Sequence, residues 1–111
     1  MRIVNLEQGM PTGDMAMTRL NQALSTARMS REKLLKIVHG YGSSGTGGVI
    51  KQRTRQLLGQ KQRAGQIKGF VGGEEFSPFS PECRKLLDAS PELSRDRDYN
   101  RGNPGITIVA L

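Results

Sequence analysis

The sequence predicts an α/β fold, a two-layer sandwich whose elements run β-α-β-α-β, then an insertion, then β. Two amphipathic segments show apolar residues at helical spacing, and each lies between short apolar runs of strand length. Glycine- and proline-rich turns separate these segments. Strand–helix–strand units imply parallel pairing with right-handed crossovers. Two helices are enough to cover one face of a four-stranded sheet.

The first half of the chain predicts two strands around one helix. Arg2 to Leu6 is a short apolar run, and Leu34 to Val38 is a longer one. Between them, Asp14 is a suitable N-cap for a helix that ends near Met29. The helix would turn one apolar stripe toward the core, formed by Ala16, Met17, Leu20, Ala23, Leu24 and Ala27.

A second helix and a third strand follow a glycine-rich loop. The helix would begin near Gly48 and end at Gly59 or Gly65. Its core face is predicted to contain Ile50, Thr54, Leu57 and Leu58. Gln66 to Val71 is then predicted to be the third strand.

Residues 74–104 form a loop and short-helix insertion with little apolar periodicity. Ser80 followed by Pro81 is a helix-start signal, and Ser90 followed by Pro91 repeats it. The alternating run from Arg95 to Asp98 is typical of a solvated, self-neutralising segment. Residues 105–111 then predict a closing strand, so that residues 1–111 form a single domain with the insertion packed on its surface.

The amino-acid composition is strongly basic, which bears on the kind of partner that the protein binds. The 111 residues include 17 Lys and Arg against 10 Asp and Glu, which gives a net charge of +7. A sequence pI near 10.2 indicates a polyanionic partner, nucleic acid above all. The alternative is a basic protein that has no such partner.

The sequence argues against disulfides, zinc sites and membrane segments. Cys83 is the one cysteine and His39 the one histidine, so neither an internal disulfide nor a Cys/His zinc site can be built within the chain. No apolar run approaches the length of a membrane span, and no signal peptide is evident. We therefore expect a cytoplasmic protein with no membrane partner and no cofactor.

The loop between the second strand and the second helix has the pattern of an anion site. A strand, a glycine-rich turn and a helix N-terminus follow in that order, and the turn contains Gly40, Gly42 and Gly45. Glycines let the backbone approach a ligand closely, and the free amides of a helix start favour negative charge. Lys51 in the first helical turn adds a positive charge. The ligand predicted by this pattern is a phosphate.

Three motifs give the chain a resemblance to the Smr domain, the small MutS-related domain. His39-Gly40-Tyr41-Gly42 resembles that family's His-Gly-x-Gly motif. Residues 48–58, with Lys51 at an Arg position, resemble its Gly-x-Leu-Arg helix. Residues 105–111 resemble its closing Gly-x-Thr-x-Val-x-Leu strand. The resemblance implies a fold like the C-terminal domain of translation initiation factor three, with a four-stranded mixed sheet whose last strand is antiparallel to the others.

The resemblance also implies nucleic-acid binding, and some members of the family nick DNA or cut RNA. Their first-strand motif is Leu-Asp-x-His-Gly. Here Asn5 stands at the Asp place and Glu7 near the His place. The usual carboxylate and one imidazole are therefore missing, and whether this chain is an enzyme stays open.

A catalytic alternative would use His39 with Glu7. If the first two strands are parallel neighbours, both side chains lie at the same sheet edge. A carboxylate can orient an imidazole as general acid or base toward an RNA 2′-hydroxyl. Otherwise His39 caps the strand and bonds the loop, or contacts a phosphate. Cleaving DNA would normally need a divalent metal ion, and Asp96 and Asp98, interleaved with arginines, do not predict a metal site.

The leading prediction is a module that grips backbone phosphates of DNA or RNA. Lys51 and Arg55 lie one helical turn apart and would extend the grip, while Tyr41 would either stack on a base or pack over loop glycines. The predicted contacts are Gly40, Tyr41, Gly42, Ser43, Ser44, Gly45, Lys51 and Arg55. Two other classes remain: a dinucleotide site, because Gly40, Gly42 and Gly45 fit Gly-x-Gly-x-x-Gly, and a protein-interaction domain that uses residues 74–104.

Overall fold

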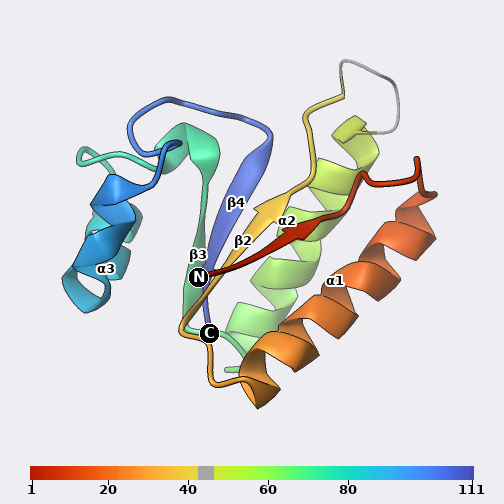
Figure 1. Ribbon diagram of the computed structural model, residues 1–111, viewed down its shortest axis with the longest axis horizontal. Coiled ribbons are helices and arrows are strands. Elements are labelled where there is room, and N and C mark those ends of the chain that lie inside the picture. The colour runs from red at the N-terminus through yellow and green to blue at the C-terminus, as the bar shows by residue number, and fades with distance from the viewer. Residues whose placement is uncertain (43–46) are drawn as a thin grey trace.

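The predicted order of elements is confirmed by a computed structural model, which describes residues 1–42 and 47–111 (Figure 1). Three α-helices, four strands and two 3₁₀ helices are present in these ranges. In chain order they are β1 (Arg2–Asn5), α1 (Gly13–Met29), β2 (Leu34–Val38), α2 (Gly47–Arg63), β3 (Gly69–Gly72), η1 (Gly73–Glu75), α3 (Pro81–Ala89), η2 (Pro91–Arg95) and β4 (Ile106–Ala110).

The four strands form one mixed sheet in the order β1-β2-β4-β3. β1 pairs with β2 in parallel, and β4 lies antiparallel to both β2 and β3. The last strand therefore runs against the other three, which confirms the predicted direction. Because β4 enters between β2 and β3, the carboxyl end of β2 meets the amino end of β4, with Val38 opposite Ile106.

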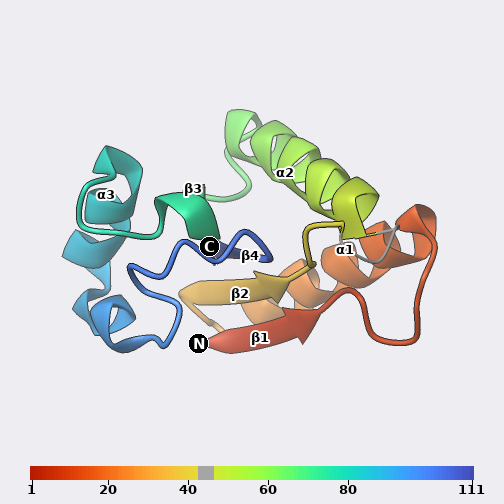
Figure 2. The same ribbon diagram turned by 90° about the horizontal axis from the view of Figure 1, so that it is seen from above.

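Helices α1 and α2 cover one face of the sheet (Figure 2). Their apolar stripes pack on Leu35, Ile37 and Val109 from the central strands. The predicted faces are confirmed for the buried residues Ala16, Met17, Leu20, Leu24, Ala27, Ile50, Thr54 and Leu58. The core on this side is aliphatic, as expected from the composition.

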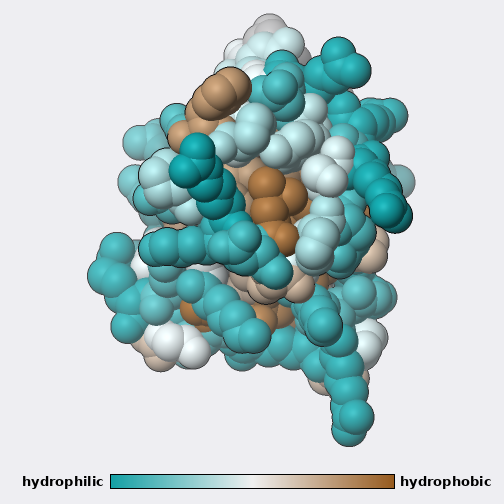
Figure 3. All heavy atoms as spheres, turned by 90° about the vertical axis from the view of Figure 1, so that its left-hand side faces the viewer, coloured by the Kyte–Doolittle hydropathy of each residue, from teal (hydrophilic) through white to brown (hydrophobic). Residues whose placement is uncertain are grey.

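The insertion covers the opposite face of the sheet as a further layer. Phe76, Cys83, Leu86 and Leu93 pack against a second apolar surface, whose strand residues are Leu34, Val71, Ile106 and Ile108. The sequence predicted a cover of two helices on one face of the sheet only. In the structure, β2 and β4 are buried on both faces. Seen from the α3 side, the outer surface is mostly hydrophilic, with an apolar patch exposed near its centre (Figure 3).

A buried lysine attaches the insertion to the sheet. Lys36 of β2 is 5% exposed, and its Nζ lies 2.8 Å from Asp96 Oδ1 and 2.5 Å from Asp98 Oδ2. Burial alone would lower the pKa of Lys36, but the hydrogen bonds and charges of the two carboxylates outweigh it and raise that pKa. The prediction that residues 95–98 form a solvated run was wrong, because their carboxylates turn inward to neutralise this cation.

Several element boundaries differ from the predictions. The second helix continues past Gly59 and ends at Arg63, before Gly65. The N-cap of α1 is Thr12 rather than Asp14, and its hydroxyl accepts a hydrogen bond from the Met15 amide. Ser80 caps α3 as predicted, by accepting from the Cys83 amide at 3.2 Å. The third strand begins at Gly69 instead of Gln66, and the first strand ends at Asn5 instead of Leu6.

Candidate nucleic-acid interface

The loop after β2 has the backbone conformation that its glycines suggest. Gly40 and Gly42 have φ of +72° and +98°, a region that side chains disfavour. Gly42 also lies so close to Gly48 that a Cβ there would come 3.0 Å from the Gly48 amide nitrogen. The described ends of the loop thus meet at the start of α2. The predicted contacts Ser43, Ser44 and Gly45 lie outside the described residues.

His39 is completely buried at the base of this loop. Its Nδ1 lies 2.7 Å from the Gly40 carbonyl oxygen and its Nε2 lies 2.8 Å from Thr107 Oγ1. A carbonyl oxygen only accepts, so Nδ1 carries the proton. Burial lowers the pKa of His39 from its ordinary 6.5 to about 4, with the Arg55 and Lys51 charges acting in the same direction against the Gly40 bond. The ring is therefore neutral at pH 7, and Nε2 accepts a hydrogen bond.

Thr107 connects this histidine to the basic side of α2. Its hydroxyl donates to His39 Nε2, because that nitrogen is unprotonated. Its oxygen in turn accepts a hydrogen bond from Arg55 Nε at 3.3 Å. Residues of the His-Gly-x-Gly loop, the second helix and the closing strand thus meet in one polar chain.

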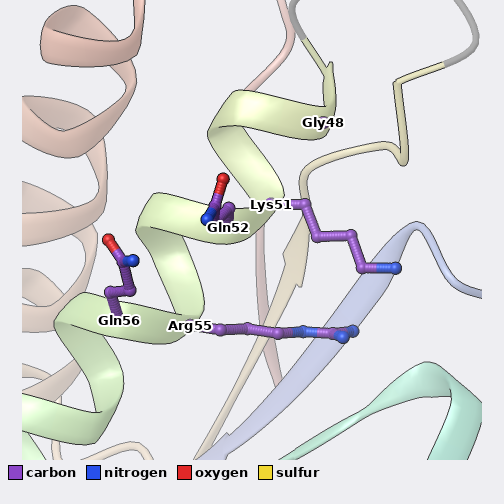
Figure 4. A pocket seen from close by; sticks show the side chains of 5 residues that line it. All are labelled: Gly48, Lys51, Gln52, Arg55 and Gln56. Atoms are coloured by element: carbon purple, nitrogen blue, oxygen red, sulfur yellow. The ribbon is translucent and has the colours of Figure 1, made fainter.

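Lys51 and Arg55 converge on a single carboxylate, that of Glu74. Arg55 donates from Nη1 to Oε2 at 3.0 Å and from Nη2 to Oε1 at 2.6 Å, and Lys51 Nζ lies 2.8 Å from Oε2. Figure 4 shows the two basic side chains extending in the same direction from α2, with Gly48, Gln52 and Gln56 completing the lining of an open hollow. The Arg55 bonds, aided by Lys51 and opposed by burial, lower the pKa of Glu74 to about 2.

Sequence reasoning placed Lys51 and Arg55 together correctly but missed Glu74. The acidic residue lies in η1, just after β3, and only the strand order brings it beside α2. A weak signal existed, because two cations four residues apart repel each other on a helix, and a nearby carboxylate relieves that repulsion.

The suggested pair of Glu7 and His39 is not formed in the structure. Both ring nitrogens of His39 already have other partners. The Glu7 carboxylate lies against the Cα side of Gly40, in the space that a Cβ at Gly40 would occupy. The two residues therefore share the predicted sheet edge, but the carboxylate does not orient the imidazole.

Tyr41 is 57% exposed next to this cluster. One edge of its ring approaches Gly105 at the start of the closing segment. The glycine that the ring approaches lies outside the glycine-rich loop, and stacking of Tyr41 on a base stays a prediction.

Other basic residues of α2 have different surroundings. Arg53 forms an ion pair of 2.8 Å with Asp14 of α1, and Lys61 Nζ lies 3.4 Å from the Gln66 side-chain oxygen. Across residues 1–42 and 47–111, no cluster of three or more His, Cys, Asp and Glu side chains is suited to a metal ion. Within the same ranges, every helix is too short or too polar to cross a bilayer.

Comparison with known proteins gives one family and one related structure. The family model of the Smr domain matches residues 8–75. The crystal structure of the Smr domain of Thermus thermophilus MutS2 superimposes with a TM-score of 0.62 at 23% sequence identity, covering 100% of this chain and 98% of that one. No curated protein sequence matches. At 23% sequence identity, this structural similarity shows a shared fold.

Proposed function

Since the chain belongs to the Smr domain family, we propose that it is a nucleic-acid-binding domain that grips backbone phosphates. The contacts would come from the Gly40–Gly42 segment, the start of α2, and the side chains of Lys51 and Arg55. The observation that carries this proposal is the coordination of the Glu74 carboxylate by three nitrogen donors from two cations, Lys51 and Arg55. Such an arrangement of donors suits any oxyanion of similar shape, and phosphate is the oxyanion that nucleic acids present.

The charge of the chain supports the same proposal. A net charge of +7 attracts a polyanion over a distance, whereas the Lys51–Arg55 pair provides a local contact. Phosphate contacts carry no base specificity. Tyr41 offers an exposed ring on which an unpaired base could stack, and this would favour single-stranded regions.

The test is a titration of fluorescently labelled oligonucleotides, followed by anisotropy at about 50 mM and about 200 mM salt. Single-stranded and double-stranded DNA and RNA of mixed sequence form the four probes. Lys51→Ala should weaken binding to all sequences alike, because a lost phosphate contact is sequence-independent. Lys85→Ala is the matched control, since it removes the same charge from an exposed position of α3, on the opposite face of the sheet.

Two results would contradict the proposal. One is an affinity that does not change between the two salt concentrations, because contacts to phosphates release counterions. The other is an equal loss of affinity in Lys51→Ala and Lys85→Ala, since net charge alone would then explain the binding.

Endonuclease activity is the alternative for a member of this family. The geometry gives it less support, because His39 is buried and both its nitrogens are engaged. Incubation with supercoiled DNA and with structured RNA, with Mg²⁺ or with chelator, decides whether cleavage occurs. His39→Ala and Glu7→Ala then test the two residues: cleavage by both variants would exclude them as an essential base and its partner.

A further inference from the structure

The position of Glu74 in the Lys51–Arg55 pair has a consequence for binding. We propose that Glu74 is a resident competitor, a carboxylate that occupies the phosphate position and must leave before a nucleic-acid phosphate can enter. This inference rests on the proposed function and adds to it the residue that limits affinity. Removing the carboxylate should therefore strengthen binding more than the loss of one negative charge elsewhere.

The first argument is the similarity of the two oxyanions. The Arg55 fork binds both carboxylate oxygens, and Lys51 adds a bond to one of them. A guanidinium makes the same two parallel hydrogen bonds to a phosphate as to a carboxylate. The two ligands therefore need the same donors and cannot be bound by them at the same time.

The second argument is that Arg55 is positioned without Glu74. Its Nε donates to Thr107 Oγ1, and Nη2 lies 3.4 Å from the Ile106 carbonyl oxygen. Gly72 also leaves space for the guanidinium, since a Cβ there would come 2.6 Å from Arg55 Nη2. When the carboxylate leaves, strand β4 and the adjoining end of β3 still hold the arginine in place.

The third argument concerns access and charge. The Glu74 side chain is 39% exposed, so an incoming phosphate can reach it from solvent. The carboxyl is attached through a flexible side chain, and it can rotate away without a change in the sheet. With its pKa lowered to about 2, it stays ionised at neutral pH and keeps competing.

The experiment compares four proteins in the anisotropy assay at about 50 mM salt: the unchanged chain, Glu74→Gln, Glu75→Gln, and the double variant Glu74→Gln with Lys51→Ala. Glu75 is the matched control, because it is the exposed neighbour and forms no ion pair within residues 1–42 and 47–111. Circular dichroism and thermal unfolding confirm that each variant is folded.

Glu74→Gln should tighten binding about three- to tenfold, and Glu75→Gln should tighten it by less than about twofold. The double variant should lose most of the gain, because the freed donors include Lys51. Equal effects of Glu74→Gln and Glu75→Gln would overturn the competitor role, as would weaker binding by Glu74→Gln, which would mean that Glu74 orients the two cations.

Together with the titrations of the unchanged chain and Lys51→Ala at two salt concentrations described above, this assay also separates the inference from the proposed function. If the unchanged chain binds with salt dependence and Lys51→Ala weakens it, phosphate binding stands whatever Glu74→Gln does. If none of the four proteins binds any probe, both proposals fail.

Discussion

The Nε2 atom of His39 lies 2.8 Å from the Thr107 hydroxyl oxygen, and both side chains are completely buried. The contact joins the loop after β2 to the closing strand β4, 68 residues further along the chain. It also sets the direction of the hydrogen bonds that reach Arg55. The stability and the charge of the candidate site therefore depend on a neutral histidine.

The pH dependence of stability should reveal this histidine. In the folded state its pKa is about 4 instead of 6.5, so between these values the unfolded chain binds the extra proton. Stability is then full above about pH 6.5 and falls toward pH 4, by at most about 1.4 kcal/mol per pH unit. Urea unfolding at a series of pH values measures the slope. The same slope in His39→Gln would exclude His39 as its source.

Replacement by valine should have different effects on stability at two buried threonines, Thr107 and Thr54. Thr107→Val leaves His39 Nε2 without a donor and Arg55 Nε without its acceptor, so we expect a loss of about 1–3 kcal/mol in the free energy of unfolding. Thr54→Val removes a buried hydroxyl that has no partner in the described part of the chain, and should be neutral or stabilising. Thermal and urea unfolding of both variants provide the measurement. A greater loss in Thr54→Val than in Thr107→Val would refute the hydrogen-bond assignment.

Lys36→Met should be strongly destabilising. It leaves the largely buried carboxylates of Asp96 and Asp98 without their cation, and removing one partner of a buried pair typically costs about 3–5 kcal/mol. Lys33→Met, at an exposed neighbouring position, should stay within about 0.5 kcal/mol. Combining Lys36→Met with Asp96→Asn and Asp98→Asn should recover part of the loss. If the triple variant is no more stable than Lys36→Met, unpaired charge is not the cause.

Gly73→Ala should lower the free energy of unfolding, whereas Gly59→Ala should raise it. A Cβ at Gly73 would collide with the backbone carbonyl of Asn103, so the insertion would have to shift where it begins. Gly59 lies inside α2 with only the end of the Arg63 side chain nearby, and alanine there should stabilise by about 0.5–1 kcal/mol. The midpoint of urea unfolding reports both effects. A Gly73→Ala protein of unchanged stability would show that the close approach is not required.

The elements that the sequence predicted well are those determined by residues close together in the chain. The helical stripe around Leu20 and Leu24, and the apolar runs of β2 and β4, carry their own periodicity. The helix start at Ser80 depends on residues that are adjacent in the chain. Such features can be read without knowing what packs against them.

The features that sequence missed depend on partners far along the chain. Lys36 meets Asp96 across 60 residues, so its burial inside a strand could not be anticipated. Glu74 reaches Arg55 only because β4 lies between β2 and β3. Similarly, nothing local distinguishes an insertion that merely packs on the surface from one that covers half of the core.

The strand order has a consequence for how the molecule assembles. Among the strands of residues 1–42 and 47–111, β3 pairs with β4 alone. A growing chain that has emerged only as far as residue 104 can therefore pair β1 with β2 but leaves β3 without a neighbouring strand. Both apolar faces of the sheet can be covered completely only when β4 has joined it. Synthesis must therefore pass residue 110 before this domain can fold cooperatively, and until then its unpaired strand edges are open to chaperones or to aggregation.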